Sequence, residues 1–373
     1  MIRRDVVVVG AGYAGLAAAA QLAGRSVSVL ERQDSVMERR RGSLGLLLPL
    51  GARALVRGDG LYFRDLDLLV EGALRHRLRR LVVRGLRERL ELTLSKPLLV
   101  MSESRLKGAL LHQVLEHGGE VVVGCPVRQV EVGRELSRVR AEDDYQARVV
   151  VGADGSSSLV SRSLGVRRGK RGMLFQRQYQ VERLELQRDT LLIQLNDYRQ
   201  MLLAYYDGEN YRASLLQFAG PRGNAGELDD TLQDWVERLG AGRVLNAFGA
   251  TVRLLEPAGD CCRPNALLAG DALAFAGFAS ITGAMAMGAL AGKVAGRLLA
   301  GSGYALTDYH KQWRRVSGQP QLERLAWLAP LWRRCDGQRI DRLLGRLHDQ
   351  SGRLPPGANL LWRLPALLWD LLV

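Results

Sequence analysis

The chain has 373 residues, of which 47% are hydrophobic and 25% are charged, and its formal net charge at pH 7 is +14. This composition excludes a disordered or fibrous chain, and the length predicts one large domain or two closely joined ones. No uninterrupted run of about 18 apolar residues appears, so no membrane-spanning helix is expected. The sequence enters a predicted strand at once, which leaves no room for a signal peptide, and we therefore expect a cytoplasmic protein.

The positive charge comes mainly from arginine and is densest at residues 75–89. Basic surfaces bind nucleic acids, anionic membranes or acidic proteins. This segment has no interleaved aromatic residues and no nucleic-acid motif accompanies it, so no nucleic-acid partner is expected. A solvated arginine-rich face is the favoured interpretation, and an acidic protein or peptide and an anionic membrane surface are the alternatives.

Cysteine and histidine do not form a recognisable site. The 4 cysteines include the adjacent Cys261 and Cys262, which are too close for an ordinary disulfide bond. Neither the cysteines nor the 5 histidines have the spacing of metal ligands, so no metal is expected.

The first residues follow the pattern of a dinucleotide-binding unit. A valine-rich segment, 5–9, predicts a buried parallel strand, which an alanine-rich helix and a second strand, 26–30, follow. The turn between the first strand and the helix contains Gly10, Gly12, Tyr13, Ala14 and Gly15. In order, its glycines allow the tight turn, the close approach of a pyrophosphate and the packing of the helix on the sheet. Glu31 ends the second strand, where a carboxylate can bind a ribose diol, so we predict that a dinucleotide binds here.

Two later segments repeat the pattern of a buried strand that ends in an acidic turn. Residues 148–155 end in Asp154-Gly155, and residues 265–271 end in Gly270-Asp271. A long helix of small residues is predicted at 283–300.

Between these segments the alternation of residues favours strands at 190–195, 201–206 and 211–218, with a hairpin turn at Asp207-Gly208. An amphipathic helix is expected at 228–239. The tyrosines of this region are interpreted as packing residues of the strands and not as catalytic groups; they are Tyr198, Tyr205, Tyr206 and Tyr211.

Together the three motifs resemble the flavin-dependent aromatic hydroxylases of the p-hydroxybenzoate hydroxylase type, and the related geranylgeranyl reductases and flavin halogenases. The resemblance covers about residues 5–300. It implies an α/β fold with a Rossmann-like FAD-binding domain of the glutathione reductase type, an interleaved antiparallel-sheet substrate domain and a helical C-terminus. The expected FAD-binding domain comprises residues 1–60, 97–168 and 256–303, the substrate domain 61–96 and 169–255, and the C-terminal segment 304–373.

The resemblance also assigns roles to single residues. The glycine turn and Glu31 would hold the ADP half of FAD, with Arg32 near the adenosine and Val127 in a strand whose backbone touches the adenine. Arg41 would lie close to the flavin, and Arg105, in SESRLKGALL, is assigned to the Arg-x-x-Leu element that opens a helix beside the pyrophosphate.

The later motifs complete the expected flavin site. Asp154 and Gly155 would lie near the pyrophosphate, and Gly270 and Asp271 at the ribityl chain. The amides near Gly283 and Ala284 would face the flavin pyrimidine edge. The chain departs from the family after Gly270-Asp271, where the usual proline and second glycine are replaced.

The resemblance implies a monooxygenase that hydroxylates a small aromatic or hydrophobic substrate with NAD(P)H, as a transient reductant, and O2 through a flavin C4a-hydroperoxide. The alternatives are a flavin-dependent reductase or dehydrogenase of an isoprenoid-like substrate, and a flavoprotein that modifies a peptide-bound or carrier-bound substrate. The Leu- and Trp-rich segment 360–373 suits packing on the protein or peripheral contact with an anionic membrane.

Overall fold

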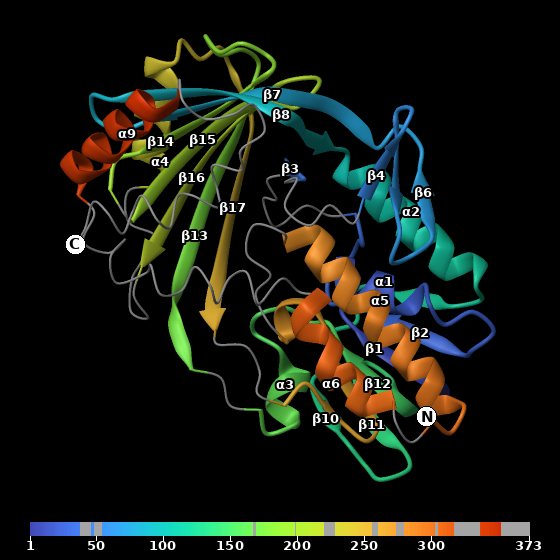
Figure 1. Ribbon diagram of the computed structural model, residues 1–373. Coiled ribbons are helices and arrows are strands. Elements are labelled where there is room, and N and C mark those ends of the chain that lie inside the picture. Colours follow the sequence, from blue (N-terminus) through green and yellow to red (C-terminus); the bar gives the residue numbers. More distant parts are fainter. Residues whose placement is uncertain are drawn as a thin grey trace.

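The fold was analysed in a computed structural model, which describes residues 1–37, 46–47, 54–166, 169–197, 199–219, 228–255, 260–273, 280–302, 305–316 and 336–351. These residues form two large sheets, a small three-stranded sheet and the helices that cover them (Figure 1).

The first sheet has a parallel centre. Its strands lie in the order β9-β2-β1-β12-β19, and each neighbouring pair is parallel. Their bounds are β1 (Ile2–Val9), β2 (Val27–Leu30), β9 (Glu120–Val122), β12 (Asp144–Gly152) and β19 (Ala266–Leu268). This is the order 3-2-1-4-5 of a dinucleotide-binding sheet. Three antiparallel strands extend it: β10 (Gln129–Glu131), β11 (Ser137–Arg140) and β18 (Cys262–Arg263).

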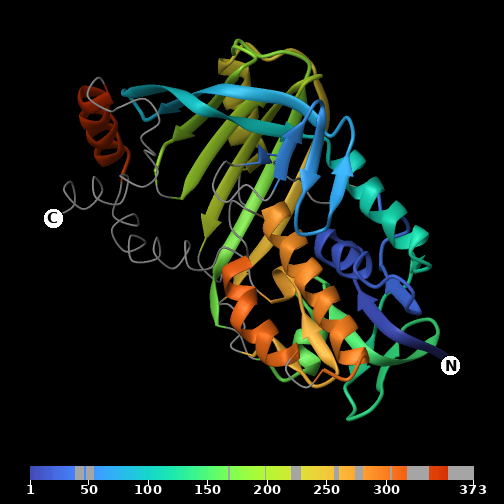
Figure 2. The same ribbon diagram turned by 45° about the vertical axis from the view of Figure 1, so that its right-hand side comes forward.

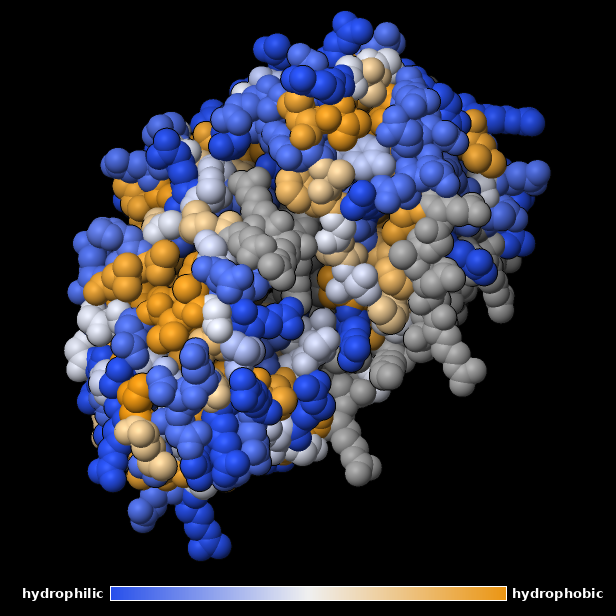
Figure 3. Space-filling model, turned by 180° about the vertical axis from the view of Figure 1, so that it is seen from behind, coloured by the Kyte–Doolittle hydropathy of each residue, from blue (hydrophilic) through white to orange (hydrophobic). Residues whose placement is uncertain are grey.

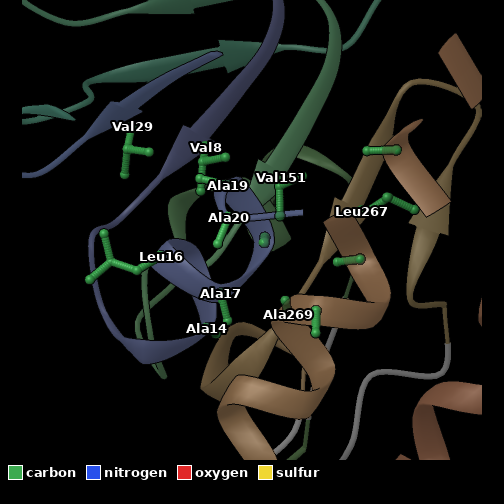
Figure 4. Close-up of a cluster of buried hydrophobic side chains, with 14 of the residues drawn as sticks. Val8, Ala14, Leu16, Ala17, Ala19, Ala20, Val29, Val151, Leu267 and Ala269 are labelled. Carbon is green, nitrogen blue, oxygen red and sulfur yellow. The ribbon is translucent and has the colours of Figure 1, made fainter. Parts of the chain in front are cut away.

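The helices α1 (Tyr13–Ala19) and α5 (Ser280–Leu299) pack against each other beside this sheet (Figure 4). Small residues make the contact possible. A Cβ atom on Gly288 would lie 2.0 Å from the carbonyl oxygen of Ala14, and one on Gly292 would lie 2.2 Å from that of Ala18. Larger residues at these two positions would push the helices apart. The other helices near the sheet are α2 (Glu103–Glu116), α3 (Leu159–Ser163) and α6 (Ala305–Val316).

The second sheet has the order β17-β13-β16-β15-β14-β7-β8-β3. Its strands are β3 (Leu46–Leu47), β7 (Leu74–Arg84), β8 (Arg89–Met101), β13 (Lys170–Val181), β14 (Thr190–Leu195), β15 (Gln200–Tyr206), β16 (Tyr211–Ala219) and β17 (Val244–Leu255). All neighbours are antiparallel except β14 and β7, which are parallel. The expected hairpin at Asp207-Gly208 joins β15 to β16, and Gly208 has the positive φ of 102° that such a turn requires.

One face of the second sheet is covered by α4 (Leu228–Arg238), which buries Leu232 and Trp235 against it. We call the opposite face the inner face. Its buried apolar residues form a separate cluster, made up of Leu78, Leu98, Val100, Leu174, Leu191, Leu203, Tyr205 and Leu216. In Figure 2 the strands β13 and β17 run from this sheet down toward the first one.

The chain crosses between the two sheets more than once, because β7 and β8 lie in sequence between β2 and α2 but belong to the second sheet. The small sheet of β4 (Ala54–Arg57), β5 (Gly60–Phe63) and β6 (Leu68–Val70) precedes them. The boundaries expected after residues 60 and 96 were wrong in detail, since they cut β5 and β8 within continuous strands.

The arginine-rich segment forms β7, the turn after it and the start of β8. Arg75 pairs with Glu209, while Arg80 and Arg89 both pair with Glu91. Helix α9 (Gly337–Ser351) packs on β8, and the Asp341 carboxylate accepts N–H groups from the β7–β8 turn.

Among the described residues, no helix is both long enough and apolar enough to cross a membrane. On the face of the molecule shown in Figure 3, hydrophobic residues lie in separate patches between hydrophilic ones.

The contact between α1 and α5 predicts a difference between two glycines of the same helix. We expect Gly292→Ala to lower the free energy of unfolding by about 1–3 kcal/mol, because the added methyl group meets backbone that cannot turn away. Gly296→Ala is the control, since its nearest neighbour would be Leu22 at 3.9 Å, and we expect it to be neutral or stabilising by up to about 1 kcal/mol. Urea unfolding of both variants measures the difference, and equal effects would contradict the packing argument.

Candidate functional site

The glycine turn between β1 and α1 is the centre of the site. Gly10 has a φ of 99°, and a Cβ atom there would lie 2.7 Å from the carbonyl oxygen of Ala153. A Cβ atom on Gly15 would lie 1.8 Å from the carbonyl oxygen of Gly10. Gly12 differs from both, because a Cβ atom there would have no neighbour within 4 Å. Two of the glycines are thus required by the fold itself, whereas Gly12 leaves open space beside the start of α1.

Glu31 fixes the shape of this turn. Its carboxylate accepts the N–H of Ala11 at 2.8 Å and the N–H of Gln33 at 3.0 Å. It lies at the end of β2, as predicted, while Arg32 beside it is exposed. Lys107 of α2 is a neighbour that sequence reasoning missed. Burial lowers the pKa of Lys107, and the negative charges of Glu31 and Glu103 oppose that shift.

Gly270, Ala14 and Ala284, all predicted to be site residues, come together. A Cβ atom on Gly270, whose φ is 60°, would lie 2.8 Å from the Cβ of Ala14 and 3.9 Å from that of Ala284. Asp271 follows in a short 3-10 helix (Gly270–Ala272) and is half-buried, and Gly283 is buried in the first turn of α5. The ends of β1 and β19 and the start of α5 therefore meet at one place.

The structure gives the Asp154 carboxylate a local task. It accepts hydrogen bonds from the Ser158 hydroxyl at 2.5 Å and from the N–H of Leu159 at 2.6 Å, which anchors the start of α3. Burial raises the pKa of Asp154, and these hydrogen bonds oppose the shift. Gly155 supplies a φ of 81° for the turn. Their contact with a pyrophosphate remains a prediction.

Two expected site residues, Arg105 and Val127, do not join this group. Arg105 is exposed and its guanidinium carbon would lie 3.2 Å from a Cβ atom on Gly72. An Arg-x-x-Leu element needs an arginine three positions before its leucine, but Glu103 stands three positions before the buried Leu106. The assignment of Arg105 to such an element was therefore wrong. Val127 was expected in a strand, but it lies in the loop between β9 and β10, where it packs on the main core. Arg41 lies outside the described residues.

A buried ion network, which sequence reasoning also missed, joins this site to the second sheet. The Arg212 guanidinium donates to the Asp207 carboxylate at 2.7 Å and to the Glu103 carboxylate at 3.5 Å. The side chains of Arg212, Asp207 and Glu103 are 9%, 1% and 11% exposed. The Tyr13 hydroxyl donates to the other oxygen of Glu103 at 3.4 Å. Glu103 is 109 positions from Arg212 and 90 from Tyr13, so no local pattern reveals these two contacts.

The charges of the network reinforce one another. Burial alone would lower the pKa of Arg212, but Tyr205, Asp207 and Glu103 outweigh it and raise that pKa. Burial would likewise raise the pKa of Asp207, but hydrogen bonds and the charge of Arg212 lower it. The guanidinium and the Asp207 carboxylate therefore stay charged over the physiological range.

Polar groups also line the inner face of the second sheet. Gln178 lies opposite Ser214 in the register of β13 and β16, and Gln176 donates to Gln178 at 3.2 Å. All three side chains are buried. The Ser214 hydroxyl has no hydrogen-bond partner among the residues that the structure describes. Burial of an unpaired hydroxyl is unfavourable, so this group is a candidate contact for a bound molecule.

Comparison with known proteins gives the site its context. Residues 5–98 match the family model described as FAD dependent oxidoreductase. Over 200 residues the chain is 32% identical to aklavinone 12-hydroxylase RdmE of Streptomyces purpurascens, a match that covers 46% of this chain and 36% of that protein. The match thus spans about a third of the length of this curated relative.

Solved structures share the complete fold. A geranylgeranyl bacteriochlorophyll reductase-like protein of Thermoplasma acidophilum superposes with a TM-score of 0.72 at 18% identity, covering 94% of this chain and 92% of that one. For p-nitrophenol 4-monooxygenase PnpA of Pseudomonas putida DLL-E4 the TM-score is 0.71 at 17% identity, with 100% and 99% covered. At such identities the likeness shows the fold, and it confirms the predicted α/β class with a Rossmann-like sheet.

The glycine turn predicts opposite effects for two substitutions. Gly15→Ala should destabilise the protein whether or not a dinucleotide is bound, because its Cβ atom overlaps the carbonyl oxygen of Gly10. Gly12→Ala should keep the melting temperature of the cofactor-free protein and weaken dinucleotide binding by on the order of tenfold or more, because its Cβ atom fills the open space. Thermal melts and cofactor titration separate the two effects. Unchanged binding by Gly12→Ala would rule out the turn as the pyrophosphate site.

Proposed function

Because this chain belongs to the FAD-dependent oxidoreductases, the superfamily that its motifs predicted, we propose that it is a monooxygenase that hydroxylates a small aromatic or hydrophobic substrate. The observation that carries this proposal is the pairing of two features. A glycine turn built for a dinucleotide lies beside a second sheet whose inner face is apolar with a few buried polar groups.

The residues of the first sheet fit FAD. The open space at Gly12 is where a pyrophosphate would approach the backbone, and Glu31 would take the ribose. Gly270 and Asp271 would hold the ribityl chain, and the first turn of α5 would face the pyrimidine edge of the flavin. The dipole of α5 would favour the reduced, anionic flavin at that edge.

The inner face of the second sheet supplies the proposed substrate site. Leu174, Leu203 and Leu216 offer apolar contact, and the Ser214 hydroxyl and the Gln176–Gln178 pair offer hydrogen bonds. Such a surface selects a flat or apolar molecule with one or two polar groups. Arg212 lies on the same face and contacts α2, so this face borders the flavin-binding part. We accordingly propose β7, β8 and β13–β17 as the substrate domain.

In the proposed reaction, the substrate, O2, NAD(P)H and a proton give the hydroxylated product, water and NAD(P)+. FAD supplies the electron transfer and the activation of oxygen. The protein excludes water through the apolar inner face and orients the substrate through Ser214, Gln176 and Gln178. No side-chain acid or base is assigned, and NAD(P)H is a transient reductant in this scheme.

The test is oxygen transfer by the FAD-loaded protein. We expect some members of a panel of phenols and aromatic polyketides to accelerate NAD(P)H oxidation and to yield products that carry one oxygen atom from 18O2 in mass spectrometry. Ser214→Ala should raise KM for such a substrate by about three- to thirtyfold, the equivalent of one lost hydrogen bond. Thr251→Ala, which removes an exposed hydroxyl from the opposite face of the same sheet, is the matched control.

Other products decide against the proposal. A reduced or desaturated product without labelled oxygen would identify a reductase or dehydrogenase instead. Labelled hydrogen peroxide as the sole oxygen product with every compound of the panel would leave an oxidase.

A further inference from the structure

The buried network of Glu103, Arg212 and Asp207 lies between the flavin turn and the substrate sheet. We propose that Arg212 is a positioning residue for FAD, which acts through Glu103 and Tyr13 to hold the glycine turn in its binding shape. The proposal uses the assignment of FAD to this turn and does not depend on the hydroxylation chemistry.

Three elements that are distant in sequence meet in this network. Tyr13 opens α1 directly after Gly12, Glu103 opens α2, and Arg212 lies in β16 next to the β15–β16 turn. Glu103 is the shared member, since one carboxylate oxygen accepts from Arg212 and the other from Tyr13. A displacement of Arg212 is therefore transmitted to the first residue of α1 through a single carboxylate.

The far end of the network is rigid. Asp207 holds the guanidinium at 2.7 Å through one oxygen, and its other oxygen accepts the N–H groups of Glu209 at 3.1 Å and Asn210 at 3.0 Å. The hairpin turn thus fixes Asp207, Asp207 fixes Arg212, and the planar guanidinium presents a second N–H group to Glu103. The substrate sheet becomes the anchor of the turn that receives the pyrophosphate.

The burial of the Asp207–Arg212 pair distinguishes it from an incidental contact on the surface. An exposed ion pair is screened by water and does little to fix the positions of its two side chains. Arg75 of β7 forms such a pair at 3.1 Å with Glu209 of the same hairpin turn, and the Glu209 side chain is 63% exposed. The side chains of Asp207 and Arg212 are nearly inaccessible, so their interaction is not screened in this way. Arg75 consequently provides a matched control for Arg212.

The experiment measures the dissociation constant of FAD by titrating cofactor-free protein, with the flavin fluorescence as readout. We expect Tyr13→Phe, which removes only the hydroxyl, to weaken FAD binding by about three- to tenfold without a change in the melting temperature of the cofactor-free protein. Arg212→Lys keeps the charge but loses the planar geometry, and we expect a loss of similar size. Arg75→Lys should leave the dissociation constant within twofold of the wild type.

A double-mutant cycle tests the path through Glu103. If Arg212 acts through this carboxylate on Tyr13, the variant with both Tyr13→Phe and Arg212→Lys should bind FAD about as weakly as either single variant. In the Glu103→Ala background, which removes the acceptor of both hydrogen bonds, Tyr13→Phe should have little further effect. Additive losses, or losses in melting temperature with an unchanged dissociation constant, would overturn the proposal. If Arg212→Lys does not fold, Asp207→Asn, which weakens the hold on the Arg212 guanidinium, takes its place in the cycle.

Discussion

The contact between Gly10 and Gly15 governs the first half of the molecule. A carbonyl oxygen lies where the Cβ atom of any other residue at position 15 would be, only 1.8 Å from that ideal position. This proximity lets α1 leave the sheet directly after β1 and lie flat on it. Further close contacts between small residues lie next to this one, because a Cβ atom on Gly270 would meet Ala14 and one on Gly288 would meet the backbone of α1. A single tightly packed layer of small residues thus sets the positions of the turn, of Asp271 and of the start of α5.

The second sheet is built on a different principle. Its strands are long, its inner face is apolar, and its link to α2 includes a buried ion pair. Arg212 and Glu103 form an ion pair across that link, and such a pair fixes orientation more sharply than apolar contact does. Helix α2 beside the glycine turn and the second sheet are therefore joined by a contact that depends on direction as well as on burial.

Local patterns predicted the parts of this structure that depend on neighbours in sequence. The valine run, the glycine turn and Glu31 carry their own periodicity and turn chemistry, and the segments 190–195 and 211–218 are rich in apolar residues and are bounded by turn residues. Val127 was placed in a strand by position in the resemblance, which does not account for the loop that this chain forms between β9 and β10. Glu103 and Arg212 were missed because 109 positions separate them, and only the folded chain brings them together. The arginine-rich segment was noticed for its charge, while its role as β7 depends on pairing with β8 and β14.

The presence of a carboxylate at position 103 gives Arg212 an electrostatic role. Glu103 contacts the residue that follows Gly12, and Glu31 contacts the same turn from the other side. Two carboxylates beside the proposed pyrophosphate site would repel the phosphates if they were left uncompensated. Lys107 lies close enough to both for their charges to influence its pKa, and Arg212 pairs directly with Glu103. A glutamate at the start of α2 is thus compatible with the proposed anionic cofactor because two cations, Lys107 of α2 and Arg212 of the second sheet, accompany it.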